Sequence, residues 1–203
     1  RSFAVDPRVL IPRPETEHLV DAALDAWRLR AGDRAAPRIL DLGTGSGCLA
    51  ITLALELPTA RVVATDLSPA ALAVAAANAR RLGAADRVSP VAADLAVGLA
   101  LGPFDLVVSN PPYVAPEAAS ALSPEVVDHE PALALFAERS GEALFERLIA
   151  ELEPVRAGVP VLFEIGYGQS EGLRRKISGS AFRLLEIRPD YAGVPRVAVL
   201  ERR

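Results

Sequence analysis

The chain has 203 residues, of which 51% are hydrophobic and 24% charged, so it fits one globular domain with a sizeable core and is not intrinsically disordered. One cysteine and two histidines exclude a disulfide framework and a Cys/His structural zinc site, and no apolar run reaches the ~20 residues of a membrane helix. The net charge of −4 argues against a nucleic-acid partner, because nucleic-acid binding usually needs a basic excess.

The order of the predicted elements indicates an α/β fold. A helix is expected at 16–29, where apolar residues recur with helical spacing. Five β-rich runs then alternate with helical segments, which is typical of a parallel sheet. We expect these strands at 38–42, 61–66, 88–92, 104–109 and 159–165. The helices between and after them are expected at 48–57, 69–82, 142–152 and 169–177.

The C-terminal part breaks this alternation. Two strand-like runs at 182–188 and 196–201 follow each other, and only a short turn with proline and glycine separates them. Without a crossover helix between them, the two strands should pair antiparallel. The sequence therefore predicts a mostly parallel seven-stranded sheet with an antiparallel C-terminal strand pair.

A glycine-rich loop, DLGTGSGC at 41–48, lies between the first strand and its helix. Glycines allow a tight turn and a close approach of a ligand to the backbone. A P-loop would need a lysine where Cys48 stands, and a dinucleotide-binding fingerprint would need its third glycine one position after Gly47. Two interpretations remain. The loop is a ligand-free turn, or it is the G-x-G-x-G pattern, with Asp41 two residues ahead, that resembles motif one of class I S-adenosylmethionine-dependent methyltransferases.

An acidic residue, Asp66, ends the second predicted strand 19 residues after Gly47. In doubly wound sheets a carboxylate at this place accepts hydrogen bonds from ribose hydroxyls. Asp66 could instead cap the next helix, but Ser68, directly before Pro69, is the better capping candidate. The glycine loop and Asp66 together predict a nucleoside-containing cofactor.

The tetrapeptide Asn110-Pro111-Pro112-Tyr113 follows the fourth predicted strand, at the edge where open α/β sheets bind ligands. Two prolines stiffen the turn and remove two backbone donors, so the nearby carbonyls and the Asn110 side-chain oxygen can accept hydrogen bonds. Rigid acceptors suit a planar NH2 group, on which Tyr113 can stack. The tetrapeptide resembles the N-P-P-Y motif of methyltransferases that act on amide or exocyclic amine nitrogens.

With these two motifs, further segments resemble the release-factor glutamine methyltransferase family over essentially the whole chain. They are LIPRPETE at 10–17, EPAL at 130–133, EIGYGQ at 164–169 and the run at 190–196. The resemblance implies a Rossmann-like class I methyltransferase fold. It also implies transfer of a methyl group from S-adenosylmethionine to the glutamine side-chain nitrogen in the Gly-Gly-Gln loop of class-one peptide chain release factors. The same resemblance implies a cytoplasmic enzyme with no metal, no direct nucleic-acid contact and no membrane contact.

The resemblance also assigns site residues. The cofactor would contact Gly43, Thr44, Gly45, Ser46, Gly47, Asp66, Asp94, Leu95 and Asn110. The substrate would contact Asn110, Pro111, Pro112 and Tyr113, of which Asn110, Pro111 and Tyr113 would be catalytic. A surface turn remains an alternative for Asp94, and Leu95 stands where some relatives carry an aromatic residue against adenine.

The resemblance further divides the chain into a leader segment and helix at 1–35, which would pack on a methyltransferase domain at 36–203. The N-terminal helical domain that members of the family use to dock the release factor has no counterpart in this sequence. Because the chain opens with Arg1-Ser2-Phe3 and contains no methionine, we expect a fragment or a processed form. The segment at 13–17 either closes over the cofactor or simply begins a helix.

Catalysis would rest on positioning, since no Cys/His pair near either motif could act as a strong base. Two rival functions remain. An adenine or cytosine amino-methyltransferase would also present an NH2 group to the N-P-P-Y loop, but the acidic balance argues against it. A non-catalytic nucleoside-binding module would keep the glycine loop and Asp66 without needing Asn110.

Overall fold

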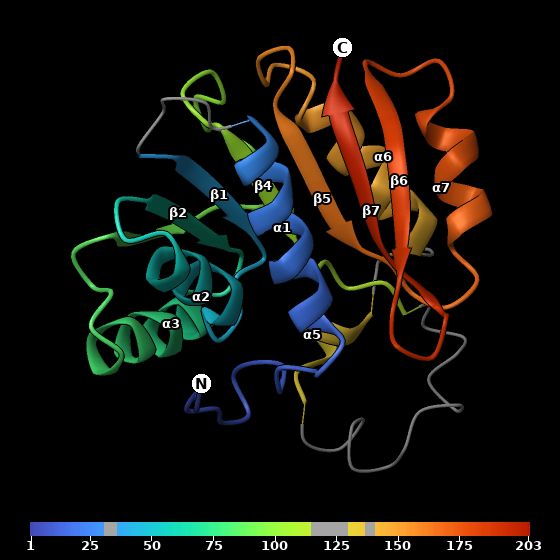
Figure 1. Cartoon of the computed structure of the whole chain (residues 1–203). Helices are drawn as coiled ribbons and strands as arrows, with labels where there is room; N and C mark the ends of the chain where they lie inside the picture. The colour runs from blue at the N-terminus through green and yellow to red at the C-terminus, as the bar shows by residue number, and fades with distance from the viewer. Residues whose placement is uncertain (31–35, 115–129, 137–140) are drawn as a thin grey trace.

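The computed structural model describes residues 1–30, 36–114, 130–136 and 141–203. Seven strands form one sheet in the order β3-β2-β1-β4-β5-β7-β6 (Figure 1). The strands are β1 (Arg38–Leu42), β2 (Arg61–Asp66), β3 (Val88–Ala92), β4 (Leu106–Ser109), β5 (Pro160–Glu164), β6 (Phe182–Pro189) and β7 (Pro195–Arg202). The helices are α1 (Thr16–Arg30), α2 (Cys48–Glu56), α3 (Pro69–Arg81), α5 (Ala132–Leu135), α6 (Gly141–Glu151) and α7 (Ser170–Ile177).

The pairing of the strands confirms the predicted fold class. Strands β3, β2, β1, β4 and β5 pair parallel, and β7 pairs antiparallel with both β5 and β6. Strand β7 lies between β5 and β6, and β6 forms the edge of the sheet. The antiparallel C-terminal pair therefore extends the sheet without a crossover helix. The sheet is therefore mostly parallel and mixed at one side, as the sequence predicted.

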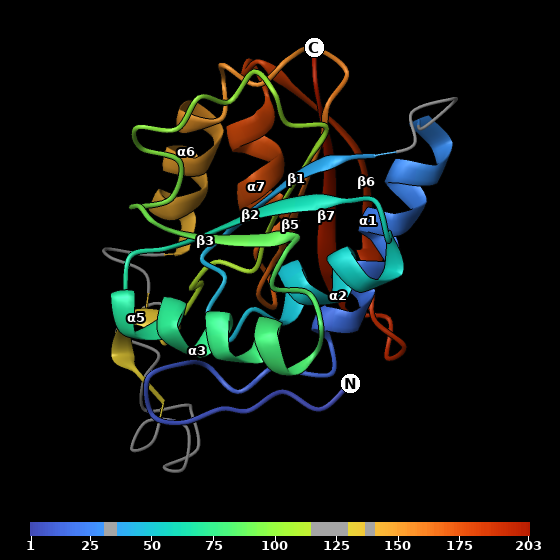
Figure 2. The ribbon, with the colours of Figure 1, turned by 90° about the vertical axis from the view of Figure 1, so that its left-hand side faces the viewer.

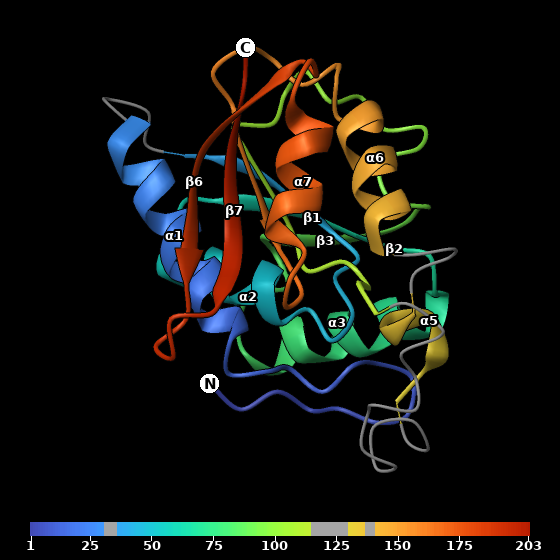
Figure 3. The ribbon, with the colours of Figure 1, turned by 90° about the vertical axis from the view of Figure 1, so that its right-hand side faces the viewer.

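Helices cover both faces of the sheet, and the strand residues alternate between the two layers. Ile39 of β1 packs in a buried cluster with α1 and α2, whereas its neighbour Leu40 packs in a second buried cluster with α6 and α7. Figures 2 and 3 show α1, α2 and α3 on one face and α6 and α7 on the other. This burial of both faces explains why the central strands read as continuous apolar runs.

Local sequence signals account for several element boundaries. The Ser68 Oγ accepts a hydrogen bond from the backbone N–H of Ala71 over 3.2 Å, so Ser68 caps α3 as predicted, with Pro69 at its first position. The fourth strand begins at Leu106 and not at Phe104, because Phe104 still lies in a turn in which its N–H bonds to the carbonyl of Leu101. Helix α5 was not predicted, since a single turn carries no periodic pattern.

The N-terminal residues lie against the outer side of α3 (Figure 2). The buried side chain of Asn78 holds them there, because it accepts from the N–H of Ala4 and donates to the Ala4 carbonyl, both over 2.9 Å. Its Nδ2 also donates to the carbonyl of Ser46 in the glycine loop. The division of the chain at residue 35 remains a prediction. None of the described helices is long and apolar enough to cross a membrane.

Candidate active site

The strand register brings the two predicted loops together. Leu42, at the end of β1, pairs with Thr65 of β2 on one side and with Ser109 of β4 on the other. Because these strands are parallel, the residues that follow them emerge at the same edge of the sheet. A cavity of about 550 Å³ opens at this edge. Seven of the predicted site residues line it: Gly43, Gly45, Asp66, Asp94, Leu95, Asn110 and Pro112.

The three glycines of the loop have different roles, although all adopt positive φ angles. A Cβ atom on Gly43 or Gly45 would meet nothing within 4 Å, so both present bare backbone to the cavity. A Cβ atom on Gly47 would lie 2.9 Å from Ile51 Cδ1 and 3.1 Å from Ala75 Cβ. Gly47 therefore allows the loop to pack closely against α2 and α3 and does not line the cavity.

The polar side chains of the glycine loop point inward. Thr44 and Ser46 are buried and do not line the cavity. Thr44 Oγ1 donates to Asp41 Oδ2 over 2.6 Å, and the N–H of Ala50 donates to the same oxygen over 3.2 Å. Burial raises the pKa of Asp41 to about 7, and the bond from Thr44 opposes that shift. Asp41 therefore joins the glycine loop to the first turn of α2 through these two hydrogen bonds.

Asp66 lies on the cavity and also holds the loops beside it. Its Oδ2 accepts from the N–H of Gly45 and its Oδ1 from the N–H of Ser68, each over 2.9 Å. Since Ser68 caps α3, Asp66 is not the capping residue. Each carboxylate oxygen can accept a further bond, so Asp66 can still receive hydroxyl donors from a ligand.

At the far side of the cavity, Asp94 forms an ion pair with Arg147 of α6 over 2.7 Å. Leu95 has a φ of 51°, and its carbonyl accepts from Thr65 Oγ1 over 3.2 Å. This bond fixes the turn that directs Leu95 to the cavity. An apolar side chain and a carboxylate therefore stand together where the resemblance places adenine.

The N-P-P-Y loop contributes two residues to the cavity, Asn110 and Pro112, while Pro111 is buried beneath it. Tyr113 is half-buried, and its hydroxyl donates to Glu164 Oε1 over 3.4 Å. Burial raises the pKa of Tyr113 to about 12, and the charge of Glu164 adds to the shift. The Tyr113 ring is thus fixed at the edge of the site and does not line the cavity.

Two polar residues next to this loop were not predicted as site residues. Thr16, the first residue of α1, donates through Oγ1 to Glu164 Oε2 over 2.8 Å and accepts from Asn110 Nδ2 over 3.2 Å. Glu164, the last residue of β5, is only 1% exposed, and burial raises its pKa. A carboxylate ending a fully buried strand was the signal that could have drawn attention to it.

The leader segment reaches the cavity upstream of 13–17. Arg8, Val9 and Leu10 line the cavity. Arg13 instead forms an ion pair with the buried Glu130 over 2.6 Å, which fixes the approach to α1. The leader therefore contributes to the cavity wall through its earlier residues.

The cavity fits S-adenosylmethionine in size and in chemistry. Its volume lies within the ~300–1,000 Å³ of small-molecule sites, and the bare backbone of Gly43 and Gly45 leaves room for a ligand. Asp66 offers a carboxylate for hydroxyl groups, and Leu95 offers an apolar surface. Among the described residues, no three His, Cys, Asp or Glu side chains gather into a metal site.

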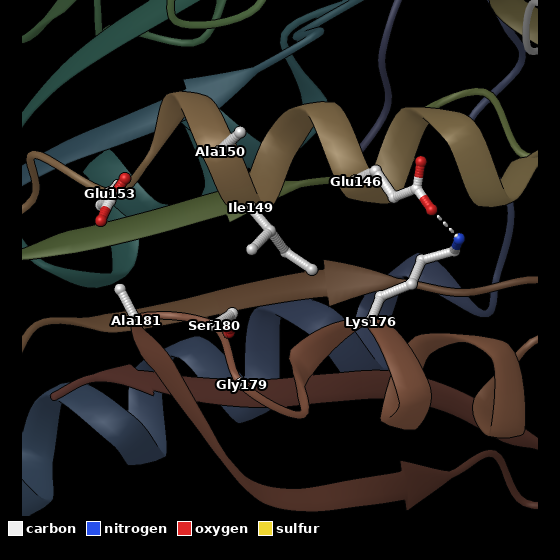
Figure 4. Close-up of a pocket in the computed structure, with 8 residues that line it drawn as sticks. All are labelled: Glu146, Ile149, Ala150, Glu153, Lys176, Gly179, Ser180 and Ala181. Carbon is white, nitrogen blue, oxygen red and sulfur yellow. Dashed lines mark hydrogen bonds and ion pairs between the residues drawn. The ribbon is translucent and has the colours of Figure 1, made fainter.

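A second cavity, of about 390 Å³, lies between α6 and the turn that precedes β6 (Figure 4). An ion pair between Lys176 and Glu146 spans its rim. None of the predicted site residues lines this cavity. The first cavity is therefore the candidate active site.

Comparison with known proteins identifies the family. The model of the family described as "Methyltransferase small domain" matches residues 24–132. A release factor glutamine methyltransferase from Bordetella pertussis is 47% identical over 199 residues, which cover 97% of this chain and 71% of that protein. The chain belongs to the release factor glutamine methyltransferase family. A second member, from Koribacter versatilis, is 41% identical and covers 98% of this chain and 69% of that protein.

Family membership confirms the predicted enzyme class, an S-adenosylmethionine-dependent methyltransferase. A solved structure supports the fold alone. A ribosomal protein L11 methylase from Lactobacillus delbrueckii subsp. bulgaricus superposes with a TM-score of 0.69 at 21% identity, covering 98% of this chain and 84% of that one.

Proposed function

We propose that this chain transfers a methyl group from S-adenosylmethionine to the side-chain amide nitrogen of the glutamine in the Gly-Gly-Gln loop of class-one peptide chain release factors. One observation carries the proposal: Asn110 of the N-P-P-Y loop lines the same cavity as Gly43, Gly45 and Asp66. The loop predicted to bind the cofactor and the predicted acceptor for an NH2 group therefore share one cavity. The choice of a release factor glutamine as substrate is supported by the names of the relatives, which are release factor glutamine methyltransferases.

In the proposed site, the cofactor would contact the predicted residues that line the cavity, which are Gly43, Gly45, Asp66, Asp94, Leu95 and Asn110. S-adenosylmethionine supplies an activated methyl group on a sulfonium. Gly43 and Gly45 would approach it through their backbone, and Asp66 would accept from its hydroxyl groups. Thr44, Ser46 and Gly47 would act indirectly, since they are packed beneath the loop.

The proposed catalytic residues work by positioning. An amide nitrogen is a poor nucleophile because its lone pair is delocalised into the carbonyl. The Asn110 side-chain oxygen and the Pro111 carbonyl would accept the two hydrogens of the substrate NH2 group and stabilise the positive charge that develops on nitrogen. Pro112 keeps the turn rigid, because its ring fixes φ and it has no N–H. The Tyr113 ring, fixed through Glu164, would border the substrate amide.

The partner in this proposal is a protein, the release factor, and the compartment is the cytoplasm, where translation termination takes place. No direct contact with nucleic acid and no membrane contact form part of the proposal. The acidic balance supports a protein partner over a base-flipping role, since it provides no general attraction to phosphates.

A methyl-transfer assay tests the proposal. The protein is incubated with labelled S-adenosylmethionine and either a release factor, the same factor with the glutamine of its Gly-Gly-Gln loop changed to alanine, or duplex DNA. We expect one methyl group, located by mass spectrometry on that glutamine, with no label on the altered factor or on DNA. Label on DNA would favour the nucleic-acid amino-methyltransferase, and donor binding without any label would favour the nucleoside-binding module.

A further inference from the structure

A chain of hydrogen bonds, centred on the buried Thr16 and Glu164, joins three separate elements behind the N-P-P-Y loop. Tyr113 OH donates to Glu164 Oε1, Thr16 Oγ1 donates to Glu164 Oε2, and Asn110 Nδ2 donates to Thr16 Oγ1. Thr16 begins α1, Glu164 ends β5, and Asn110 and Tyr113 belong to the loop after β4. Thr16 and Glu164 do not line the cavity, so they act on it only through their neighbours.

The direction of these bonds follows from the chemistry of their ends. Both oxygens of Glu164 accept hydroxyl donors, from Tyr113 and Thr16, and these bonds lower the pKa of Glu164 against the effect of burial, so the hydroxyl proton of Thr16 goes to Glu164. A hydroxyl has a single proton, so the bond between Thr16 and Asn110 must be donated by the Asn110 NH2 group. The side-chain amide of Asn110 is therefore held in one of its two possible orientations, with the NH2 group toward Thr16. Its oxygen remains available to a ligand.

This orientation decides what the site can recognise. An oxygen accepts hydrogen bonds from an NH2 group, whereas a flipped amide would present its own NH2 group to the substrate's NH2 group and leave both unpaired. We infer that Glu164, acting through Thr16, is the positioning residue that turns the Asn110 oxygen toward the methyl acceptor. The same carboxylate holds the Tyr113 hydroxyl, so one buried acid positions both polar side chains of the loop. The inference rests on the proposed function in one respect: it takes the group that receives the methyl to be the NH2 group of an amide.

The test begins with Thr16→Val, which keeps the shape of the side chain but removes its hydroxyl, and with the matched control Thr16→Ser, which keeps the hydroxyl. We expect kcat on the release factor to fall about 10- to 100-fold in Thr16→Val, less than for the loss of a hydrogen bond made directly to the reacting group, because Thr16 acts through Asn110. The Kd for S-adenosylmethionine should stay within about 2-fold, and Thr16→Ser should restore kcat to within about 3-fold.

A second variant tests the role of Glu164. A glutamine at 164 can present either its oxygen or its NH2 group to Thr16, so both orientations of Asn110 become possible and kcat should fall less than in Thr16→Val. Because Glu164 acts on Asn110 through Thr16, the two effects should be less than additive: Glu164→Gln should slow Thr16→Val by less than it slows the wild type, and any remaining loss belongs to the bond with Tyr113. A purely structural role would instead lower the melting temperature, the donor affinity and kcat together.

A spectroscopic readout separates this inference from the proposed function. The NMR signals of the Asn110 Nδ2 hydrogens, identified by their loss in Asn110→Ala, should be shifted and slow to exchange in the wild type and in Thr16→Ser. They should resemble those of a solvated amide in Thr16→Val. This pattern in a protein that does not methylate a release factor would support the inference while removing the proposed function.

Three results would overturn the inference: unchanged kcat in folded Thr16→Val, a loss of donor affinity equal to the loss of kcat, or fully additive effects in the double variant. If Thr16→Val does not fold, Glu164→Gln decides alone, since unchanged kcat and unchanged Asn110 signals in that protein would contradict the inference.

Discussion

The backbone N–H of Gly45 donates a hydrogen bond to Oδ2 of Asp66 over 2.9 Å. This bond ties the loop after β1 to the end of β2, so two walls of the cavity are joined within the protein itself. The carboxylate therefore holds the loop, and in the proposed site it would also accept hydrogen bonds from the cofactor. A substitution at Asp66 should affect the cofactor through both.

Asp66→Ala should weaken the binding of S-adenosylmethionine by about 1.5–3 kcal/mol, the usual contribution of a hydrogen bond to a charged group. The loss has two sources, the ligand's hydroxyl groups and the freed Gly45 amide. Calorimetric titration of the folded variant measures it. Asp86→Ala is the matched control, since Asp86 is exposed and does not line the cavity, so the donor affinity should stay nearly unchanged. Unaltered donor affinity in Asp66→Ala would remove Asp66 from the cofactor site.

Asn110→Ala should reduce turnover about 100-fold or more while leaving the donor Kd within a few-fold. In the proposed site, the donor is held mainly by the loops at Gly43, Gly45 and Asp66, whereas Asn110 acts mainly on the substrate NH2 group. Steady-state rates with a release factor, combined with donor titration, measure both quantities. Equal losses of rate and donor affinity would limit Asn110 to its cofactor contact and contradict its proposed role on the substrate NH2 group.

Gly47→Ala and Gly45→Ala form a matched pair, because both positions have positive φ angles that disfavour alanine. At Gly47 the new Cβ would also collide with Ile51 Cδ1 at 2.9 Å, whereas at Gly45 it would meet nothing within 4 Å. We expect Gly47→Ala to lower the free energy of unfolding by about 1–3 kcal/mol more than Gly45→Ala, as overpacking does. Gly45→Ala should weaken donor binding more, since its Cβ would occupy the cavity. Chemical denaturation measures the two stabilities, and donor titration measures the two affinities. A Gly45→Ala protein less stable than Gly47→Ala would contradict the predicted order of stability.

Asp41 should make stability depend on pH. Its pKa is raised from 3.8 to about 7 in the folded protein by burial, so between these values the folded state binds a proton that the unfolded state has lost. The free energy of unfolding should therefore fall as the pH rises from about 4 to about 7 and level off above that. Asp41→Asn, which cannot titrate, should lack this contribution. The difference between the two proteins, measured by denaturation across this range, should change with pH, and a constant difference would contradict the raised pKa.

The sequence by itself determined the order of the elements, the mixed sheet and the two loops. These features are local: hydrophobic periodicity defines helices and strands, and glycine and proline define turns. The rule that ligands bind at the carboxyl ends of parallel strands then placed both loops at one edge, and the register of Leu42 with Ser109 confirms it.

Only the tertiary structure decided what supports those loops. Thr16 and Glu164 are 148 residues apart in the chain, and their contact exists because α1 packs across the end of β5. The loop sequence likewise does not distinguish Gly45 from Gly47, since it is the position of Ile51 and Ala75 that makes one a cavity residue and the other a packing residue. Such roles depend on side chains brought together by folding, and no local pattern in the sequence encodes that proximity.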